Sequence, residues 1–159
     1  MASKGNQALL KSLPKLPPDI RITIVSTEWN EAITDELVKG ATKVLKQAGY
    51  MPQVYKVPGA VEVPYLIRQI HDNQIPKPDA FIAFGCVIKG DTPHFDYVCK
   101  SITDGITQLN LSLLSPVIFG VLTVNTEQQA KERIGGIHGH KGEEAAITAL
   151  KMIALKHSI

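Results

Sequence analysis

The stretch AFIAFGCVIKGDTPHFDYV, residues 80–98, joins three kinds of local sequence. Its first nine residues, 80–88, are almost all apolar, which is typical of a short strand buried on both faces of a parallel sheet. A polar loop follows, and Thr92 and Pro93 are residue types favoured at the N-cap and first position of a helix. Apolar residues then recur at helical spacing, at Val98, Ile102, Ile106 and Leu109. The stretch therefore predicts a strand, a loop and a helix in direct succession.

The loop between this strand and helix carries the reactive side chains. It contains Lys89, Asp91 and Thr92, and His94 follows in the first turn of the helix. The carboxyl ends of parallel strands form the edge where α/β proteins bind ligands, and the free N–H groups of a helix N-terminus attract anions. Histidine can accept or donate a proton near neutral pH. We therefore expect His94 to act beside a bound anion; the alternative is a histidine that only decorates a surface turn.

Length and composition favour one domain that folds without a metal or disulfide. The chain has 159 residues, and its 17 basic and 15 acidic residues leave a net charge of +2 without a basic block. This argues against nucleic acid or an anionic membrane as a partner. No apolar run approaches the ~20 residues of a membrane span, and the start lacks the apolar core of a signal peptide, so we expect a cytoplasmic protein. Cys86 and Cys99 have no metal or redox spacing and are expected to be reduced.

The remainder of the chain alternates between strand and helix patterns. Further strands are predicted at 21–26, 53–57 and 116–123. A helix is predicted directly after the turn 27–30, with an apolar face from Ile33 to Ala48 and with Gly49 as its end. Further helices are predicted at 65–74, from Asn125 or Thr126 to Arg133, and at about 142–155. Residues 1–19 contain three prolines and are expected to form an extended N-terminal arm, with 20–159 as a single domain. The expected fold class is α/β, a four-stranded parallel core sheet with helices on both faces.

Loops that follow parallel strands meet at one edge of the sheet. Here they bring together Trp29, the loop 59–62, the loop 89–94 and residues 123–125. Such a set offers an aromatic ring for stacking, the carboxylate of Glu62, and backbone amides that can hydrogen-bond a planar heterocycle. The sequence thus predicts a composite pocket for a ring compound that carries an anionic group.

Each candidate has a simpler interpretation. Trp29 could serve packing, and an acid such as Glu62 is favourable at any helix start. Arg133 and Lys141 flank a glycine-rich turn and could be solvated surface cations.

Other site classes find little support in the sequence. His138 and His140 suggest zinc, but no third ligand has suitable spacing, so we expect no metal. The chain has no Gly-x-Gly-x-x-Gly, P-loop or Gly-x-Ser-x-Gly motif, which disfavours nicotinamide, nucleotide and serine-hydrolase sites.

Four separated motifs resemble one enzyme family. They are VPGAVEVP at 57–64, GCVIKGDTPHFDYV at 85–98, PVIFGVLT at 116–123 and EQQA at 127–130. Over about residues 21–154 the chain is thereby similar to the 6,7-dimethyl-8-ribityllumazine synthases. The resemblance implies a flavodoxin-like three-layer α/β/α sandwich and a cofactor-free transferase of riboflavin biosynthesis. Such an enzyme condenses 5-amino-6-(D-ribitylamino)uracil with 3,4-dihydroxy-2-butanone 4-phosphate to 6,7-dimethyl-8-ribityllumazine, releasing phosphate and water.

The resemblance also implies roles for individual residues. Trp29 would stack on the pyrimidine, His94 would transfer protons, and Arg133 would bind the phosphate. Further substrate contacts are implied for Ala60, Val61, Glu62, Cys86, Val87 and Ile88 around the ring and ribityl chain, for Asp91 and Thr92 beside the phosphate, and for Phe119 from a neighbouring subunit, with Lys141 as an additional substrate-binding candidate.

Two positions depart from the family pattern. Val61 stands where a larger aromatic is common. Asp91 places a carboxylate beside the expected phosphate site, which would weaken phosphate binding unless only its backbone N–H touches the anion.

The family also implies an assembly. Its members form homo-oligomers, either pentamers or icosahedral shells of 60 subunits, and the short turn at 135–142 favours the shell. The implied partners are the two small-molecule substrates and riboflavin synthase.

Two other classes of protein remain open from the sequence. A flavodoxin-like or receiver-like binding module would share the sheet, although Ser26-Thr27-Glu28-Trp29-Asn30 is a poor loop for a flavin phosphate. A flavin-binding or shell-forming homologue that lost catalysis would keep the fold, with Val61 and Asp91 as its signs.

Overall fold

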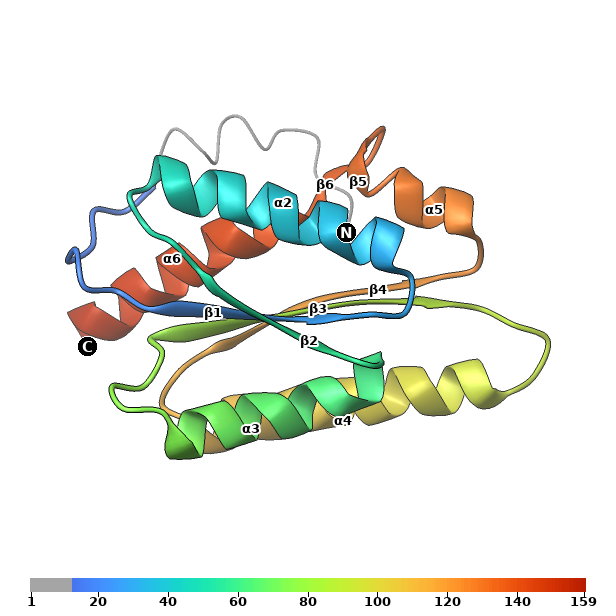
Figure 1. The fold of residues 1–159 in the computed structure, drawn as a ribbon, viewed down its shortest axis with the longest axis horizontal. Helices are drawn as coiled ribbons and strands as arrows, with labels where there is room; N and C mark the ends of the chain where they lie inside the picture. Colours follow the sequence, from blue (N-terminus) through green and yellow to red (C-terminus); the bar gives the residue numbers. More distant parts are fainter. Residues whose placement is uncertain (1–12) are drawn as a thin grey trace.

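The computed structural model describes residues 13–159, so the first twelve residues of the expected arm lie outside the described residues. Four parallel strands form a sheet in the order β2-β1-β3-β4. The strands are β1 (Ile22–Thr27), β2 (Gln53–Val57), β3 (Ala80–Ile88) and β4 (Val117–Val124). Helices α2 (Glu31–Gln47) and α6 (Lys141–Ser158) cover one face, and α3 (Val63–Asn73) and α4 (His94–Ser112) cover the other (Figure 1). This arrangement confirms the predicted three-layer α/β/α fold.

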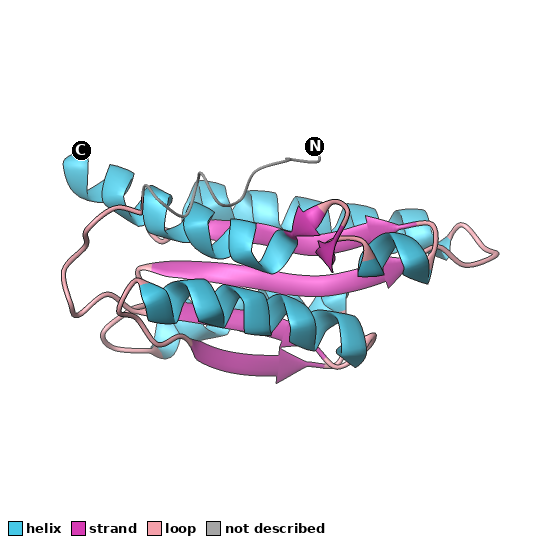
Figure 2. Ribbon diagram, turned by 90° about the horizontal axis from the view of Figure 1, so that it is seen from above, coloured by secondary structure: helices cyan, strands magenta, loops and turns pink. Residues whose placement is uncertain are grey.

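Strand β3 joins the two cores of the molecule. Since side chains alternate across a strand, Ile82 and Phe84 pack in the cluster beneath α2 and α6, whereas Phe81 and Ala83 pack against α3 and α4. All four are fully buried. Figure 2 shows the long strands running in one direction, as βαβ connections require. The apolar run was therefore interpreted correctly as a central strand.

Two helix starts differ from the prediction. Helix α4 begins at His94 with Pro93 at the N-cap, one residue later than expected, although the Thr92 hydroxyl still accepts a hydrogen bond from the His94 N–H at 3.4 Å. A 3₁₀ turn, η1 (Ala60–Glu62), precedes α3, which begins at Val63 rather than at 65. Pro64 is tolerated there because the first turn of a helix has no internal N–H bonds to lose.

The segment between β4 and α6 contains a hairpin that was not predicted. Helix α5 (Glu127–Lys131) is capped by Thr126, whose hydroxyl accepts a hydrogen bond from the Gln129 N–H at 3.3 Å. The short strands β5 (Ile134–Gly136) and β6 (Gly139–His140) then pair antiparallel. Helix α6 follows directly, so the hairpin sets where its first residue lies.

Helix α2 makes a close contact with the β5–β6 hairpin at Gly40. A Cβ built on this glycine would lie only 2.1 Å from Cε1 of His140, so the imidazole occupies the space that a side chain would need. The hairpin is thereby held against α2.

The described part of the N-terminal arm runs along the same layer. Residues 13–17 have no regular structure, and Leu13 and Leu16 pack against the α2–α6 cluster. The Tyr50 hydroxyl donates a hydrogen bond to the Leu16 carbonyl at 2.8 Å.

Candidate active site

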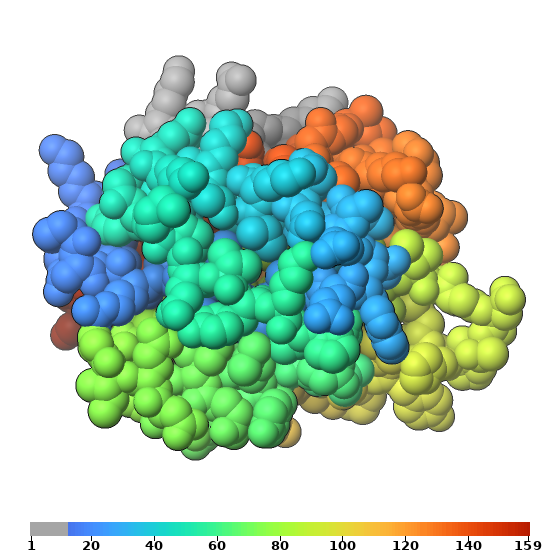
Figure 3. Space-filling view, viewed as in Figure 1, coloured from blue at the N-terminus to red at the C-terminus, as the bar shows by residue number. Residues whose placement is uncertain are grey.

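A cleft opens at the carboxyl end of the sheet, where β1 and β3 separate. Their ladder ends at Val25 and Ala83, but β3 continues to Ile88. The loops after β1 and β2 and the start of α4 surround this projecting strand end and leave a volume of about 480 Å³, which we call the Trp29 cleft. Residues 89–93 extend beyond the rest of the molecule at the right of Figure 3. Nine of the predicted site residues line the cleft: Trp29, Ala60, Val61, Glu62, Cys86, Val87, Ile88, Thr92 and His94.

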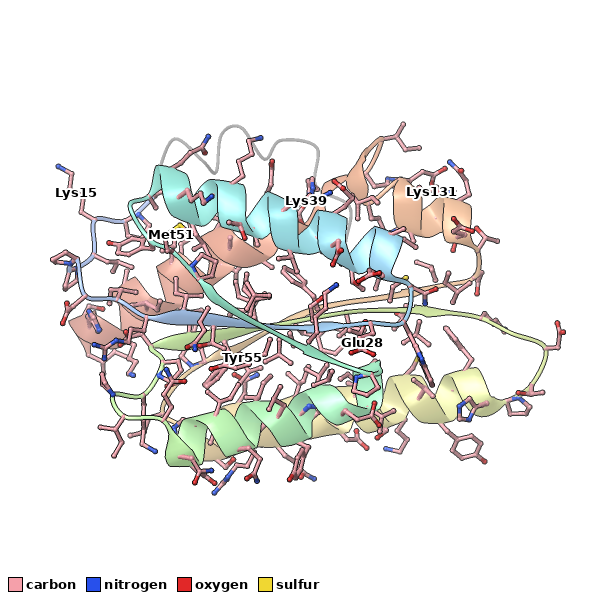
Figure 4. The ribbon with its side chains drawn as sticks, in the orientation of Figure 1. Lys15, Glu28, Lys39, Met51, Tyr55 and Lys131 are labelled. Carbon is pink, nitrogen blue, oxygen red and sulfur yellow. The ribbon has the colours of Figure 1, made fainter. Side chains whose placement is uncertain are left out.

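Trp29 lies at the mouth of the cleft with its backbone anchored. Its N–H donates to the Pro58 carbonyl at 3.1 Å, which continues the pairing of β1 with β2 past the strand ends. The side chain is 71% exposed, so the indole has a free surface in this subunit. In Figure 4, Glu28 marks the loop that leads from β1 to this position.

The carboxylate of Glu62 stabilises the loop after β2, on the other side of the cleft from Trp29. Its Oε2 accepts a hydrogen bond from the Gly59 N–H at 3.0 Å, and the rest of the exposed side chain faces the cleft. The bond holds the loop in shape and leaves the second carboxylate oxygen available to a ligand hydroxyl.

Asn30 is a cleft residue that sequence reasoning missed. It has φ 59°, the left-handed conformation that asparagine adopts more readily than most residues. Its side-chain amide donates a hydrogen bond to the Cys86 carbonyl at 2.7 Å. This bond replaces the one that a backbone N–H of β1 would donate if the pairing of β1 with β3 continued this far. An asparagine directly before a helix was the available signal.

His94 opens α4 and is exposed, with its ring in contact with the cleft. The free N–H groups at this end of a 19-residue helix make it suitable for an anion such as a phosphate. Asp91 is exposed and does not line the cleft. The Asp91 carboxylate therefore does not take up space inside the cleft where an anion would bind.

Cys86 contributes backbone rather than reactive sulfur. Burial, and next the nearby Glu127 carboxylate, raise the pKa of the Cys86 thiol to about 11. The thiol is therefore protonated at neutral pH and is a poor nucleophile.

The other three predicted site residues lie elsewhere on the subunit. Phe119 and Lys141 line a second cleft, also of about 480 Å³, which runs along β4 and which we call the β4 cleft. Since β4 is an edge strand, this cleft lies on the β4 side of the sheet. Phe119 is 43% exposed, and the Lys141 ammonium lies 2.6 Å from a Glu144 carboxylate oxygen.

Arg133 belongs with this second group. It follows α5, which Figure 4 marks with Lys131 on the α2–α6 side of the sheet. Its carbonyl accepts a hydrogen bond from the Lys141 N–H at 2.8 Å, and its guanidinium donates to the Gln129 carbonyl at 2.7 Å. The backbones of Arg133 and Lys141 are thus joined at the β5–β6 hairpin, and neither residue lines the Trp29 cleft.

The two loop histidines point to different neighbours. His140 packs on Gly40, whereas the His138 Nε2 lies 3.8 Å from Glu132 Oε2. Within residues 13–159, no group of three His, Cys, Asp or Glu side chains is placed to hold a metal ion. The same part of the chain has no helix that is both long and apolar enough to cross a membrane.

Comparison with known proteins gives a consistent result. The family model for 6,7-dimethyl-8-ribityllumazine synthase matches residues 19–157. The chain is 51% identical over 141 residues to the 6,7-dimethyl-8-ribityllumazine synthase of Porphyromonas gingivalis, covering 87% of this chain and 86% of that protein. It is 47% identical over 157 residues to the enzyme of the same name from Cytophaga hutchinsonii, covering 96% of each chain.

Proposed function

Since this chain belongs to the 6,7-dimethyl-8-ribityllumazine synthase family, we propose that the Trp29 cleft is where it carries out the lumazine synthase reaction of riboflavin biosynthesis. The observation that carries the proposal is the convergence of nine predicted site residues on one cleft, from three separate loops, the end of β3 and one helix start. The reaction assigned to the chain rests on the family; the placement of its substrates is our inference.

The reaction needs positioning and proton transfer. The 5-amino group of the pyrimidine attacks the ketone, and the resulting carbinolamine loses water to give an imine. Phosphate leaves with its bridging oxygen and electron pair, and the remaining enol becomes a ketone. The ribityl-substituted nitrogen adds to this carbonyl, and loss of a second water completes the second ring. Each step moves a proton, and none changes the total oxidation state, so one histidine beside the reacting atoms can serve several steps.

The pyrimidine fits the inner part of the cleft. The exposed face of Trp29 offers a stacking surface, and the strand end 86–88 offers backbone groups beyond the last β1 pairing. The free oxygen of Glu62 is suited to a ribityl hydroxyl.

The butanone phosphate fits at the start of α4. Its dianion would accept hydrogen bonds from the helix N-terminus beside Thr92, which places the ketone near His94. Asp91 would contribute its N–H alone, because its side chain does not line the cleft.

Phe119, Arg133 and Lys141 complete the site from a neighbouring subunit. They cluster beside the β4 cleft rather than the Trp29 cleft, and a head-to-tail ring brings the β4 side of one subunit to the Trp29 side of the next. Arg133 would then bind the phosphate from outside the Trp29 cleft, because a guanidinium can donate two parallel hydrogen bonds to a phosphate. Such a ring is the pentamer that we propose, with a 60-subunit shell, a riboflavin synthase partner and a cytoplasmic location remaining predictions.

His94→Ala tests the placement of the chemistry, with His157→Ala, an exposed histidine near the end of α6, as the matched control. Product absorbance follows single turnover of the two purified substrates. We expect His94→Ala to slow the reaction by less than the ~10²–10⁴-fold typical of general acid–base groups, because amine and ketone held together react readily. The control should keep the wild-type rate. An unchanged rate in folded His94→Ala would remove this histidine from the mechanism.

A further inference from the structure

Gly59 lies where the two sides of the Trp29 cleft converge. Its N–H donates to Glu62 Oε2 at 3.0 Å. A Cβ built on Gly59 would lie 3.0 Å from the same oxygen and 3.2 Å from Cε3 of the Trp29 ring, with Cζ3 of that ring at 3.4 Å. The indole and the carboxylate thus approach the bare Cα from two directions.

The backbone of Gly59 does not itself require glycine. Its φ of −140° and ψ of 179° are an extended conformation that any residue adopts. The reason for a glycine is therefore space: an added methyl group would force the ring and the carboxylate to move by a few tenths of an ångström.

We propose that Gly59 is a positioning residue for the pyrimidine substrate, because its missing side chain sets where the Trp29 ring and the Glu62 carboxylate rest. The inference rests on the proposed role of the Trp29 cleft. Trp29 is 71% exposed and its ring lies against Gly59, so the space at this glycine helps to set the height and tilt of the stacking face. The orientation of the Glu62 carboxylate also depends on Gly59, because the Gly59 N–H donates the hydrogen bond that holds it.

Gly59→Ala tests the proposal through steady-state kinetics. We expect KM for the ribitylaminouracil to rise about tenfold, within the range that loss of a stacking contact produces. We expect kcat to stay within about twofold and KM for the butanone phosphate to stay unchanged, because the three atoms nearest the added Cβ belong to Glu62 and Trp29 and not to His94. The emission of Trp29, the single tryptophan, should shift in the ligand-free enzyme.

Gly85→Ala is the matched control. A Cβ there would meet Thr27 Cγ2 at 3.4 Å and Ala60 Cβ at 3.5 Å, which are ordinary contact distances, so KM should change less than about twofold.

A double-mutant cycle identifies the route of the effect. In a Trp29→Ala background, Gly59→Ala should raise KM for the pyrimidine less than about threefold. An equal effect in both backgrounds, or unchanged KM and emission in folded Gly59→Ala, would overturn the proposal.

The remaining outcomes are also decisive. If Trp29→Ala itself leaves KM unchanged, the stacking role fails and the proposed use of the cleft fails with it. If Gly59→Ala does not fold, the double variant Trp29→Ala with Gly59→Ala removes the contact with the ring. Should that chain also fail to fold, Gly59 is a structural requirement and not a positioning residue.

Discussion

The side-chain amide of Asn30 donates a hydrogen bond to the main-chain carbonyl of Cys86, 56 residues further along the chain, at 2.7 Å. The bond joins the loop that carries Trp29 to the strand end that offers its backbone to a ligand. Around it, the Thr27 hydroxyl donates to the Trp29 carbonyl at 3.0 Å, and the Thr34 hydroxyl donates to the Thr27 carbonyl at 2.9 Å. The loop that carries Trp29 and the end of β3 are therefore held together as one unit.

Mixed assemblies should be more active than either parent assembly. Suppose that His94→Ala chains and Arg133→Ala chains are unfolded together and reassembled in equal amounts. A shared site is intact where an Arg133→Ala chain supplies the histidine and the adjacent His94→Ala chain supplies the arginine, which random placement in a head-to-tail ring gives at roughly a quarter of sites. Product absorbance measures the recovery.

Simple mixing without unfolding is the control for this experiment and should give no recovery. If mass measurement shows mixed rings whose activity stays at the level of the parents, His94 and Arg133 serve one subunit, and the shared site is wrong.

Acidification should destabilise the fold through His140. Burial, as the largest cause, lowers the pKa of His140 below its usual 6.5. The unfolded state therefore binds a proton more readily than the folded state, and stability is lost as pH falls from about 6.5 through the folded pKa, by at most about 1.4 kcal/mol per pH unit. Urea midpoints at pH 7.5 and 5.5, taken at one subunit concentration, measure this loss.

His140→Gln should show a smaller loss between these two pH values, whereas the exposed control His157→Gln should behave like the wild type. Equal pH sensitivity in all three proteins would assign the effect to other groups.

Cys86 should resist alkylation. With its pKa raised to about 11, about one thiol in a thousand is ionised at pH 8, so iodoacetamide should modify it at least about 100-fold more slowly than a free cysteine. Peptide mass spectrometry separates this reaction from that of Cys99, whose pKa is raised by burial and by Asp96. Urea should equalise the two rates, and rapid modification of Cys86 in the folded protein would contradict its burial.

The fold could be predicted because its main elements differ in pattern. The run 80–88 is too short and too apolar to be anything but a buried strand, and the faces of α2 and α4 follow helical spacing. The β5–β6 hairpin could not be found, since strands of two or three residues rich in glycine have no period. The start of α3 was misplaced because Pro64 was assigned to the preceding loop, although the first turn of a helix accepts proline.

The residues around the Trp29 cleft were the predictable part of the candidate site. Trp29, Glu62 and His94 converge because parallel strands end at one edge. Asn30 was missed because its role depends on a carbonyl that is distant in sequence. The placement of Phe119 and Lys141 depends on which edge of the sheet β4 occupies, and no local pattern contains strand order.

The position of the β4 cleft determines how many complete sites an assembly of subunits contains. If each site needs the Trp29 side of one subunit and the β4 side of the next, an open run of n subunits contains n − 1 complete sites and leaves one unused half at each end. A single subunit contains none. Only closure brings the number of sites up to the number of chains, so the specific activity of a dilute preparation reports the fraction of subunit contacts that are formed.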